Sequence, residues 1–237
     1  MRSLSLLILS IFFFSATYAQ DAVLVFSKTA GYRHKSIGVG KVAIMNLGNE
    51  NKFRVDTTED ASVFSLANLK KYKTVVFLST TGNVLDSVQQ IAFEQYIKQG
   101  GGYVGVHAAA DTEYNWPWYN QLCGAYFLSH PKQQNAEIEV VDKKFIATTM
   151  LPDRWKRFDE WYSYKSIADG ISVLAKLDEK TYEGGKNGDN HPIAWYRNYD
   201  GGRSFYTGLG HTDESYKEDL FMQHLLGGIK WAMGRRK

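Results

Sequence analysis

The sequence has little cysteine, and it lacks the glycine patterns of nucleotide-binding proteins. Cys123 is the only cysteine among 237 residues, so an internal disulfide is excluded, and we interpret it as a small buried apolar residue. There is no G-x-G-x-x-G fingerprint after a predicted strand, and there is no phosphate-binding P-loop. These absences argue against a nicotinamide-dependent dehydrogenase.

An excess of charge is also missing. The formal net charge is +3, and the terminal run 235–237 supplies that excess. No basic stripe interleaved with aromatic residues is present, so we expect no nucleic-acid partner. Aromatic residues are instead plentiful, with 6 Trp, 15 Tyr and 13 Phe, a composition found in proteins that stack on sugars and also in large cores.

The first residues have the pattern of a secretory signal peptide. A basic start, an apolar run at Leu4–Phe14 and small residues before Gln20 predict a signal peptide over 1–19. The apolar run is too short for a comfortable membrane span, so none is expected after cleavage. No linker rich in Pro, Gly or Ser follows, which favours one domain over 20–237. We therefore expect an exported protein, periplasmic or secreted.

Short apolar runs then alternate with helical patterns. Asp86 and Gln89 form a predicted capping box at the start of the clearest helix, Asp86–Gln99. Alternation of strands and helices is typical of a parallel sheet wound with helices. The predicted strands of this part are Ala22–Phe26, Phe53–Thr57, Thr74–Ser79 and Tyr103–Val106, with helices at Ser36–Glu50 and Asp86–Gln99 and a short helical link at Ser65–Lys71.

The second half favours strands. A turn at Asp200-Gly201-Gly202 predicts a β-hairpin between the last two of them. Phe127–Pro131 is predicted to be a loop that presents His130. The predicted strands are Ala136–Val141, Phe158–Tyr164, Ser172–Leu177, His191–Tyr196 and Arg203–Leu209, with a short helix from about Trp116 to Gly124 and a last helix at Glu218–Met233.

Three histidines fall at predicted carboxyl ends of strands. His107 follows the run Tyr103–Val106, and His34 and His211 hold similar positions after other strands. Ligands of open parallel sheets bind in the crevice outside these strand ends. Each histidine has a plain alternative, which is a ring satisfied by neighbouring backbone groups.

Glu160, in an aromatic setting, completes a candidate catalytic set with His34, His107 and His211. If these residues converge, imidazole and carboxylate groups can share proton transfer next to a sugar carbonyl. The alternative is that the same groups hold a divalent metal, since His with a carboxylate suits zinc and similar ions. No His-x-x-x-His pair is present, so a metal cofactor stays open.

Several motifs together resemble the ThuA-like (trehalose utilisation) family. They are Gly100–Ala109, Phe127-x-x-His130-Pro131, Asp159-Glu160-x-Tyr162, His191–Trp195 and Gly202–His211. The resemblance implies an α/β fold of the class I glutamine amidotransferase type, a flavodoxin-like three-layer sandwich with a mainly parallel central sheet and C-terminal β-hairpin additions. In true amidotransferases a nucleophilic cysteine follows the elbow strand. His107 holds that place here, so glutamine amidotransferase activity is not expected.

The trehalose connection implies a saccharide as the small-molecule partner. We expect an exported enzyme of saccharide catabolism that isomerises a sugar or keto-sugar or cleaves a keto-glycoside. The alternative is a non-catalytic carbohydrate-binding protein that uses the same cleft and stacks sugar rings on Trp116, Trp118, Trp161 and Trp195. Soluble nicotinamide cofactors are scarce outside the cytoplasm, so any dehydrogenation in the pathway would fall to a separate oxidoreductase. The candidate substrate-binding residues are Tyr32, Asp111, Trp116, His130, Tyr162, His191 and Trp195.

Overall fold

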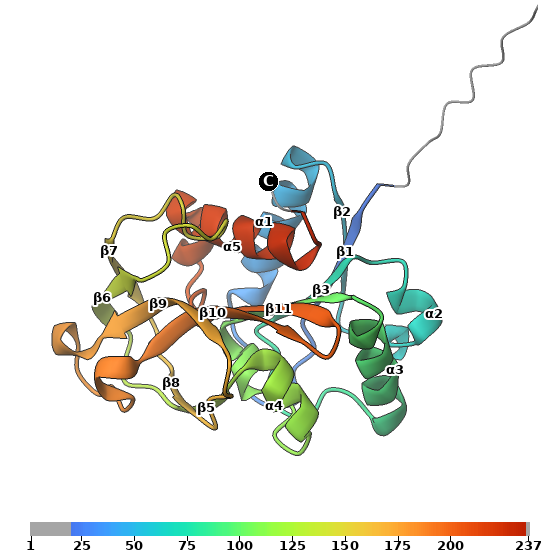
Figure 1. Cartoon of the computed structure of the whole chain (residues 1–237), viewed down its shortest axis with the longest axis horizontal. Helices are drawn as coiled ribbons and strands as arrows, with labels where there is room; N and C mark the ends of the chain where they lie inside the picture. The colour runs from blue at the N-terminus through green and yellow to red at the C-terminus, as the bar shows by residue number, and fades with distance from the viewer. Residues whose placement is uncertain (1–19, 236–237) are drawn as a thin grey trace, which may run out of the picture.

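A computed structural model describes residues 20–235 (Figure 1), and the expected signal peptide at 1–19 lies outside the described residues. The strands are β1 (Ala22–Phe26), β2 (Arg54–Thr58), β3 (Thr74–Leu78), β4 (Gly102–Val106), β5 (Tyr126–Ser129), β6 (Gln134–Val140), β7 (Arg154–Asp159), β8 (Ser163–Lys165), β9 (Ser172–Asp178), β10 (Pro192–Tyr199) and β11 (Gly202–Thr207). The helices are α1 (Ile37–Glu50), α2 (Leu66–Leu69), α3 (Ser87–Lys98), α4 (Pro117–Cys123) and α5 (Asp219–Ala232).

A nine-stranded sheet forms the centre of the fold, in the order β2-β1-β3-β4-β11-β10-β9-β6-β7. The strands from β2 to β11 pair in parallel, in the order expected of a flavodoxin-like sheet. Strands β1, β3 and β4 are buried along their whole length, which explains their continuous apolar sequences. The predicted wound sheet is therefore confirmed.

The other half of the sheet is antiparallel. Strands β10, β9, β6 and β7 add to β11 one after another, each antiparallel to its neighbour. The predicted hairpin of β10 and β11 is present, but the addition is larger than a C-terminal hairpin because it includes strands from before it. Because strand direction alternates along this half, β7 and β9 run in the same direction as the parallel strands. Their carboxyl ends therefore lie at the same end of the sheet as those of the parallel strands.

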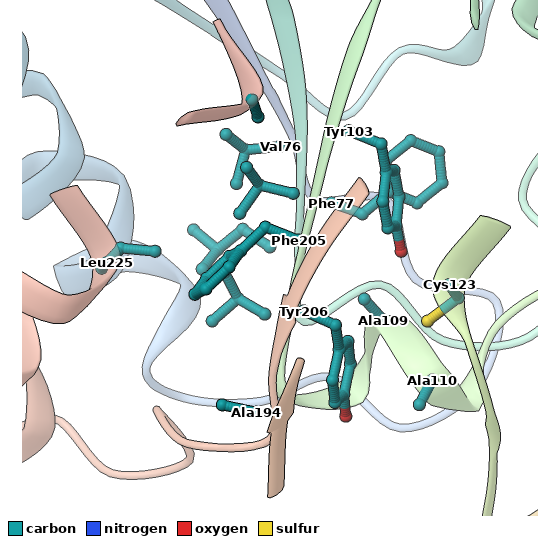
Figure 2. Close-up of a cluster of buried hydrophobic side chains, with 14 of the residues drawn as sticks. Val76, Phe77, Tyr103, Ala109, Ala110, Cys123, Ala194, Phe205, Tyr206 and Leu225 are labelled. Carbon is teal, nitrogen blue, oxygen red and sulfur yellow. The ribbon is translucent and has the colours of Figure 1, made fainter. Parts of the chain in front are cut away.

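Helices cover both faces of the sheet. Figure 1 shows α1 and α5 on one face and α3 and α4 on the other. Successive residues of β11 serve both layers: Phe205 points toward Leu225 of α5, and Tyr206 points toward Ala109 and Cys123 (Figure 2). Cys123 is buried and free, as expected. Within residues 20–235 no helix has the length and apolar character needed to cross a membrane.

Two local predictions were wrong. Residues 126–129 form strand β5, not part of a loop, because they pair with β8 in a separate two-stranded sheet. The predicted strand Phe158–Tyr164 is interrupted: β7 ends at Asp159 and β8 begins at Ser163. Glu160 lies in this interruption and therefore belongs neither to the nine-stranded sheet nor to the two-stranded one.

The buried ring of His224 in α5 generates a pH prediction. Its Nδ1–H donates to the Ala147 carbonyl over 2.8 Å, and Nε2 has no partner among the described residues. Burial lowers the pKa of His224 to about 4. The unfolded chain therefore takes up a proton first as the pH falls, and this stabilisation is lost between pH 6.5 and about 4.

We expect wild-type protein to lose about 1–2 kcal/mol more unfolding free energy than His224→Asn between pH 7 and pH 5. Asparagine keeps a donor for Ala147 but does not titrate. Urea denaturation at both pH values measures the difference. The contributions of the other histidines to the pH dependence cancel, because both proteins contain them. Equal losses would show that the ring is not held neutral by the fold.

Candidate functional site

The four candidate catalytic residues are delivered to one edge of the sheet by four different strands. His34 lies in the loop after β1, His107 follows β4 directly, and His211 follows β11 after a short turn. Glu160 follows β7, which is four places away from β11 in the sheet order. The antiparallel half must therefore curl back for Glu160 to reach the histidines.

Asp159 makes this return possible. Its fully buried carboxylate accepts backbone N–H groups from Gly210 (3.0 Å), His211 (3.1 Å) and Glu160 (2.9 Å). Arg157, also buried, lies 3.2 Å from the same carboxylate. These bonds join the end of β7 to the turn after β11 and place Glu160 beside His211.

His107 occupies the elbow after β4 in a left-handed backbone conformation, with φ of +49°. Non-glycine residues are held in this region only where surrounding structure enforces it, and such residues cluster at functional sites. The His107 carbonyl accepts the hydroxyl of Tyr206 over 2.7 Å, and Nδ1–H donates to the Gly208 carbonyl over 3.0 Å. The ring is therefore fixed with Nε2 facing the other candidate residues.

The ligand-type atoms of His34, His107, Glu160 and His211 lie within 4.8 Å of one another. His107 Nε2 is 3.0 Å from His211 Nδ1 and 3.4 Å from Glu160 Oε2. His211 Nδ1 is 3.0 Å from the same Glu160 oxygen. We call these four residues the His/Glu cluster.

The charge of the His/Glu cluster follows from its surroundings. Burial, with the neighbouring His107 and His211, lowers the pKa of His34 to about 3, so this ring is neutral at pH 7. Burial opposes ionisation of Glu160, but hydrogen bonds with His107 and His211 outweigh it and lower the pKa of this carboxyl. The cluster therefore holds a carboxylate beside nitrogen donors.

A cavity of about 430 Å³ opens onto the cluster. Asp111 lines it, and Tyr114 donates to Asp111 Oδ1 over 2.6 Å, while no protein partner is found for Oδ2 among the described residues. Burial raises the pKa of Asp111, which makes its carboxylate a better proton acceptor than an exposed one. The lining residues are Tyr32, His34, Asp111, Phe127, His130, Gln133, Glu160, Tyr162 and His211.

The structure brings some of the predicted binding residues to the cavity and leaves others out. Tyr32, Asp111, His130 and Tyr162 line it, and His130 Nδ1 lies 3.2 Å from Glu160.

Trp116, Trp195 and His191 do not line the cavity. Trp116 and Trp195 are buried, and their indole N–H groups donate to Glu94 and to the Cys123 carbonyl. Stacking of these rings on a sugar, as the sequence suggested, is therefore not supported because the core already covers them.

His191 acts from behind the cavity wall. Its ring is fully buried, with Nε2–H donating to the Tyr162 carbonyl over 2.8 Å. Nδ1 lies 2.6 Å from Glu179 Oε1 and 3.2 Å from the Tyr182 hydroxyl. The Tyr162 ring in turn contacts the His107 ring, with centroids 4.3 Å apart. His191 therefore positions Tyr162 rather than contacting a ligand.

Gln133 and Tyr114 were missed by the sequence reasoning. The side-chain amide of Gln133 lies 2.8 Å from His211 Nε2, and Tyr114 orients Asp111. Neither residue belongs to a recognisable local pattern, because each works through a partner that is distant in sequence or reoriented by a turn.

Comparisons with known proteins identify the family and the fold of the chain. A model of the ThuA family, described as trehalose utilisation, matches residues 22–232. A search of curated proteins found no match.

Among solved structures, a putative ThuA-like protein from Bacteroides uniformis ATCC 8492 is 26% identical, with a TM-score of 0.78 over 94% of this chain and 97% of that one. One from Parabacteroides merdae ATCC 43184 is 23% identical, with a TM-score of 0.77 over 91% of this chain and 90% of that one, and this likeness shows the fold. A β-galactosidase from Bacillus circulans sp. alkalophilus is 16% identical, with a TM-score of 0.57 over 90% of this chain and 31% of that one, and shares the fold only.

We expect Asp159→Asn to lower the free energy of unfolding by about 3 kcal/mol, because it leaves the buried Arg157 short of a carboxylate and disturbs three backbone N–H bonds. Urea denaturation at pH 7 measures the change. Glu218→Gln is the matched control: Glu218 also lies 3.2 Å from Arg157 but is partly exposed, so a loss under about 1 kcal/mol is expected. Similar losses for both variants would contradict the role given to Asp159.

Proposed function

Because the chain belongs to the ThuA family, we propose that it is an exported enzyme of saccharide catabolism that acts on a sugar or keto-sugar. The reaction is isomerisation or cleavage of a keto-glycoside at the cavity above the His/Glu cluster. Both reactions begin by removing a proton from a carbon next to a carbonyl group. They therefore need a group that stabilises the resulting negative oxygen and a group that carries the proton.

The observation that carries the proposal is the convergence of His34, His107, Glu160 and His211 at the floor of a cavity that has a separate carboxylate on its wall. The cluster marks the place at the cavity floor where the carbonyl oxygen of the substrate would lie. Asp111 offers a free Oδ2, held in orientation by the bond from Tyr114 to Oδ1. This division of roles keeps the proton carrier apart from the charge-stabilising group.

The cavity wall suits a carbohydrate. The rings of Phe127 and Tyr162, with centroids 4.3 Å apart, form an apolar part of the lining. Carboxylate, imidazole and amide groups from Asp111, His130 and Gln133 form the polar part. Sugars present the same combination, with C–H groups on one side and hydroxyls around the edge, so aromatic and hydrogen-bonding groups are both needed.

The burial of the tryptophans bears on the alternative of a non-catalytic carbohydrate-binding protein. That alternative relied on stacking by Trp116, Trp118, Trp161 and Trp195. Trp116, Trp161 and Trp195 are buried, and Trp118 donates to Asp200, away from the cavity lining.

Export and a separate oxidoreductase complete the proposed setting. The leader-like start of the sequence supports export to the periplasm or beyond. Keto-sugars arise by dehydrogenation of ordinary sugars, and a nucleotide fingerprint is absent from this sequence. A different enzyme would therefore supply the keto-sugar to this one.

A panel of keto-sugars and keto-glycosides in deuterated buffer tests the proposal, with deuterium incorporation and product formation followed by NMR. We expect turnover by wild-type protein and a drop of about 100-fold or more in kcat/KM for Asp111→Asn, the size of a lost acid–base group. His224→Asn, remote from the cavity, serves as the control with unchanged turnover at pH 7.

Sugar binding without deuterium exchange or products would support the non-catalytic alternative. Absence of both binding and turnover across the panel would overturn the saccharide proposal. Full activity of Asp111→Asn would leave a saccharide enzyme in place but remove Asp111 as its proton carrier.

A further inference from the structure

We infer that the His/Glu cluster binds one divalent first-row transition metal ion, with His34, His107, Glu160 and His211 as its protein ligands. The inference deepens the proposed function, on whose choice of cavity it rests, by naming the electrophile at the cavity floor. Its geometric basis is independent of any substrate. The donor atoms come from four strand ends and all lie within 4.8 Å of one another.

The spacing of the donor atoms matches a common centre. Zinc bonds of about 2.0–2.1 Å to nitrogen and oxygen place neighbouring tetrahedral ligands about 3.3–3.4 Å apart. The three separations among His107 Nε2, His211 Nδ1 and Glu160 Oε2 are 3.0, 3.0 and 3.4 Å. One ion can therefore contact all three atoms after only small movements of the side chains.

His34 supplies the fourth donor. Its ring meets the rings of His107 and His211 edge-on, with centroids 4.9 and 5.1 Å apart. The side chain is 4% exposed, and its Nδ1 has no hydrogen-bond partner among the described residues. A buried nitrogen without a partner is costly, and coordination through Nδ1 would remove this cost. A purely hydrogen-bonded cluster leaves it unexplained.

The outer nitrogens of the other two histidines are held as metal-binding histidines usually are. His107 Nδ1–H donates to the Gly208 carbonyl, so the Nε2 lone pair faces the cluster. The side-chain amide of Gln133 lies 2.8 Å from His211 Nε2. The amide nitrogen of Gln133 is the nearer atom, so the amide must rotate by about 180° to bring its oxygen to His211 Nε2. Nε2–H then donates outward, and the Nδ1 lone pair faces the ion.

The donor set also selects the class of metal. Three imidazoles and one carboxylate suit Zn²⁺, Fe²⁺, Co²⁺ or Ni²⁺, whereas Ca²⁺ and Mg²⁺ prefer oxygen ligands. His34, Glu160 and His211 line the cavity, so an ion among them has a side open to a small molecule. With four protein ligands, the open position is a fifth one, and expansion to five ligands would let the ion polarise a carbonyl oxygen.

The test is metal binding by untagged, chelator-treated protein. ZnCl₂ is titrated calorimetrically, Co²⁺ is followed by its visible absorption bands, and bound metal is counted by elemental analysis. We expect about one equivalent of Zn²⁺ in wild type and cobalt bands typical of low coordination number. We expect His107→Ala and Glu160→Gln to bind more weakly by over 100-fold, and Gln133→Leu by about tenfold, as is usual for the loss of an outer partner.

His130→Ala is the matched control, because His130 contacts Glu160 but is not in the proposed ligand set. It should keep the full equivalent of metal. Circular dichroism establishes that each variant is folded; if a ligand variant does not fold, the cobalt bands of wild type and Gln133→Leu still report whether histidine nitrogens coordinate the ion.

Absence of Zn²⁺ binding and of cobalt bands in wild type would overturn the inference. Binding that survives in Glu160→Gln and His107→Ala would overturn it too, because the ion would then lie elsewhere. Sugar turnover by metal-free protein would refute the role of the metal as the electrophile while leaving the proposed function intact. One equivalent of metal without sugar turnover would support the metal site and count against the saccharide proposal.

Discussion

The buried carboxylate of Asp159 is the constraint on which the candidate site depends. Parallel strands bring His34, His107 and His211 together by topology alone, because β1, β4 and β11 end at one edge. Glu160 has no such guarantee, since β7 is the last strand of the antiparallel half. Asp159 ties that strand to the turn after β11 through the N–H groups of Gly210 and His211. The acidic member of the cluster is therefore positioned by one buried carboxylate and not by the sheet.

A second constraint acts at His107. The left-handed elbow after β4 places one side chain at the mouth of the sheet, and the small residues Ala108–Ala110 that follow are fully buried. A cysteine at such a position is an exposed nucleophile in amidotransferases. A histidine there has both ring nitrogens engaged, one by the Gly208 carbonyl and one by the cluster. The histidine at this elbow therefore offers an imidazole held in one orientation where an amidotransferase has a thiol nucleophile.

Much of the fold could be predicted from the sequence, because buried strands have continuous apolar sequences that can be recognised locally. Continuous apolar runs marked β1, β3 and β4, and the capping box of Asp86 and Gln89 is present at α3. Three of the four cluster residues could be predicted for the same reason, since they follow recognisable strands. The interruption after β7 could not be predicted, because the sequence Phe158–Tyr164 alternates without a break. The break arises only because β8 pairs with β5 in a separate sheet. Trp116 and Trp195 resembled sugar-stacking residues because composition does not distinguish a buried indole from an exposed one.

The residues that sequence reasoning missed share a physical reason. Gln133 and Tyr114 act through other side chains. Gln133 contacts His211, and Tyr114 contacts Asp111, so each orients a residue that its own sequence pattern does not point to. His191 acts in the same indirect way, through the carbonyl of Tyr162. Each helps to fix a ring or carboxylate in one orientation, and fixed orientation lets a cavity of this size place a small polar molecule between the cluster on its floor and Asp111 on its wall.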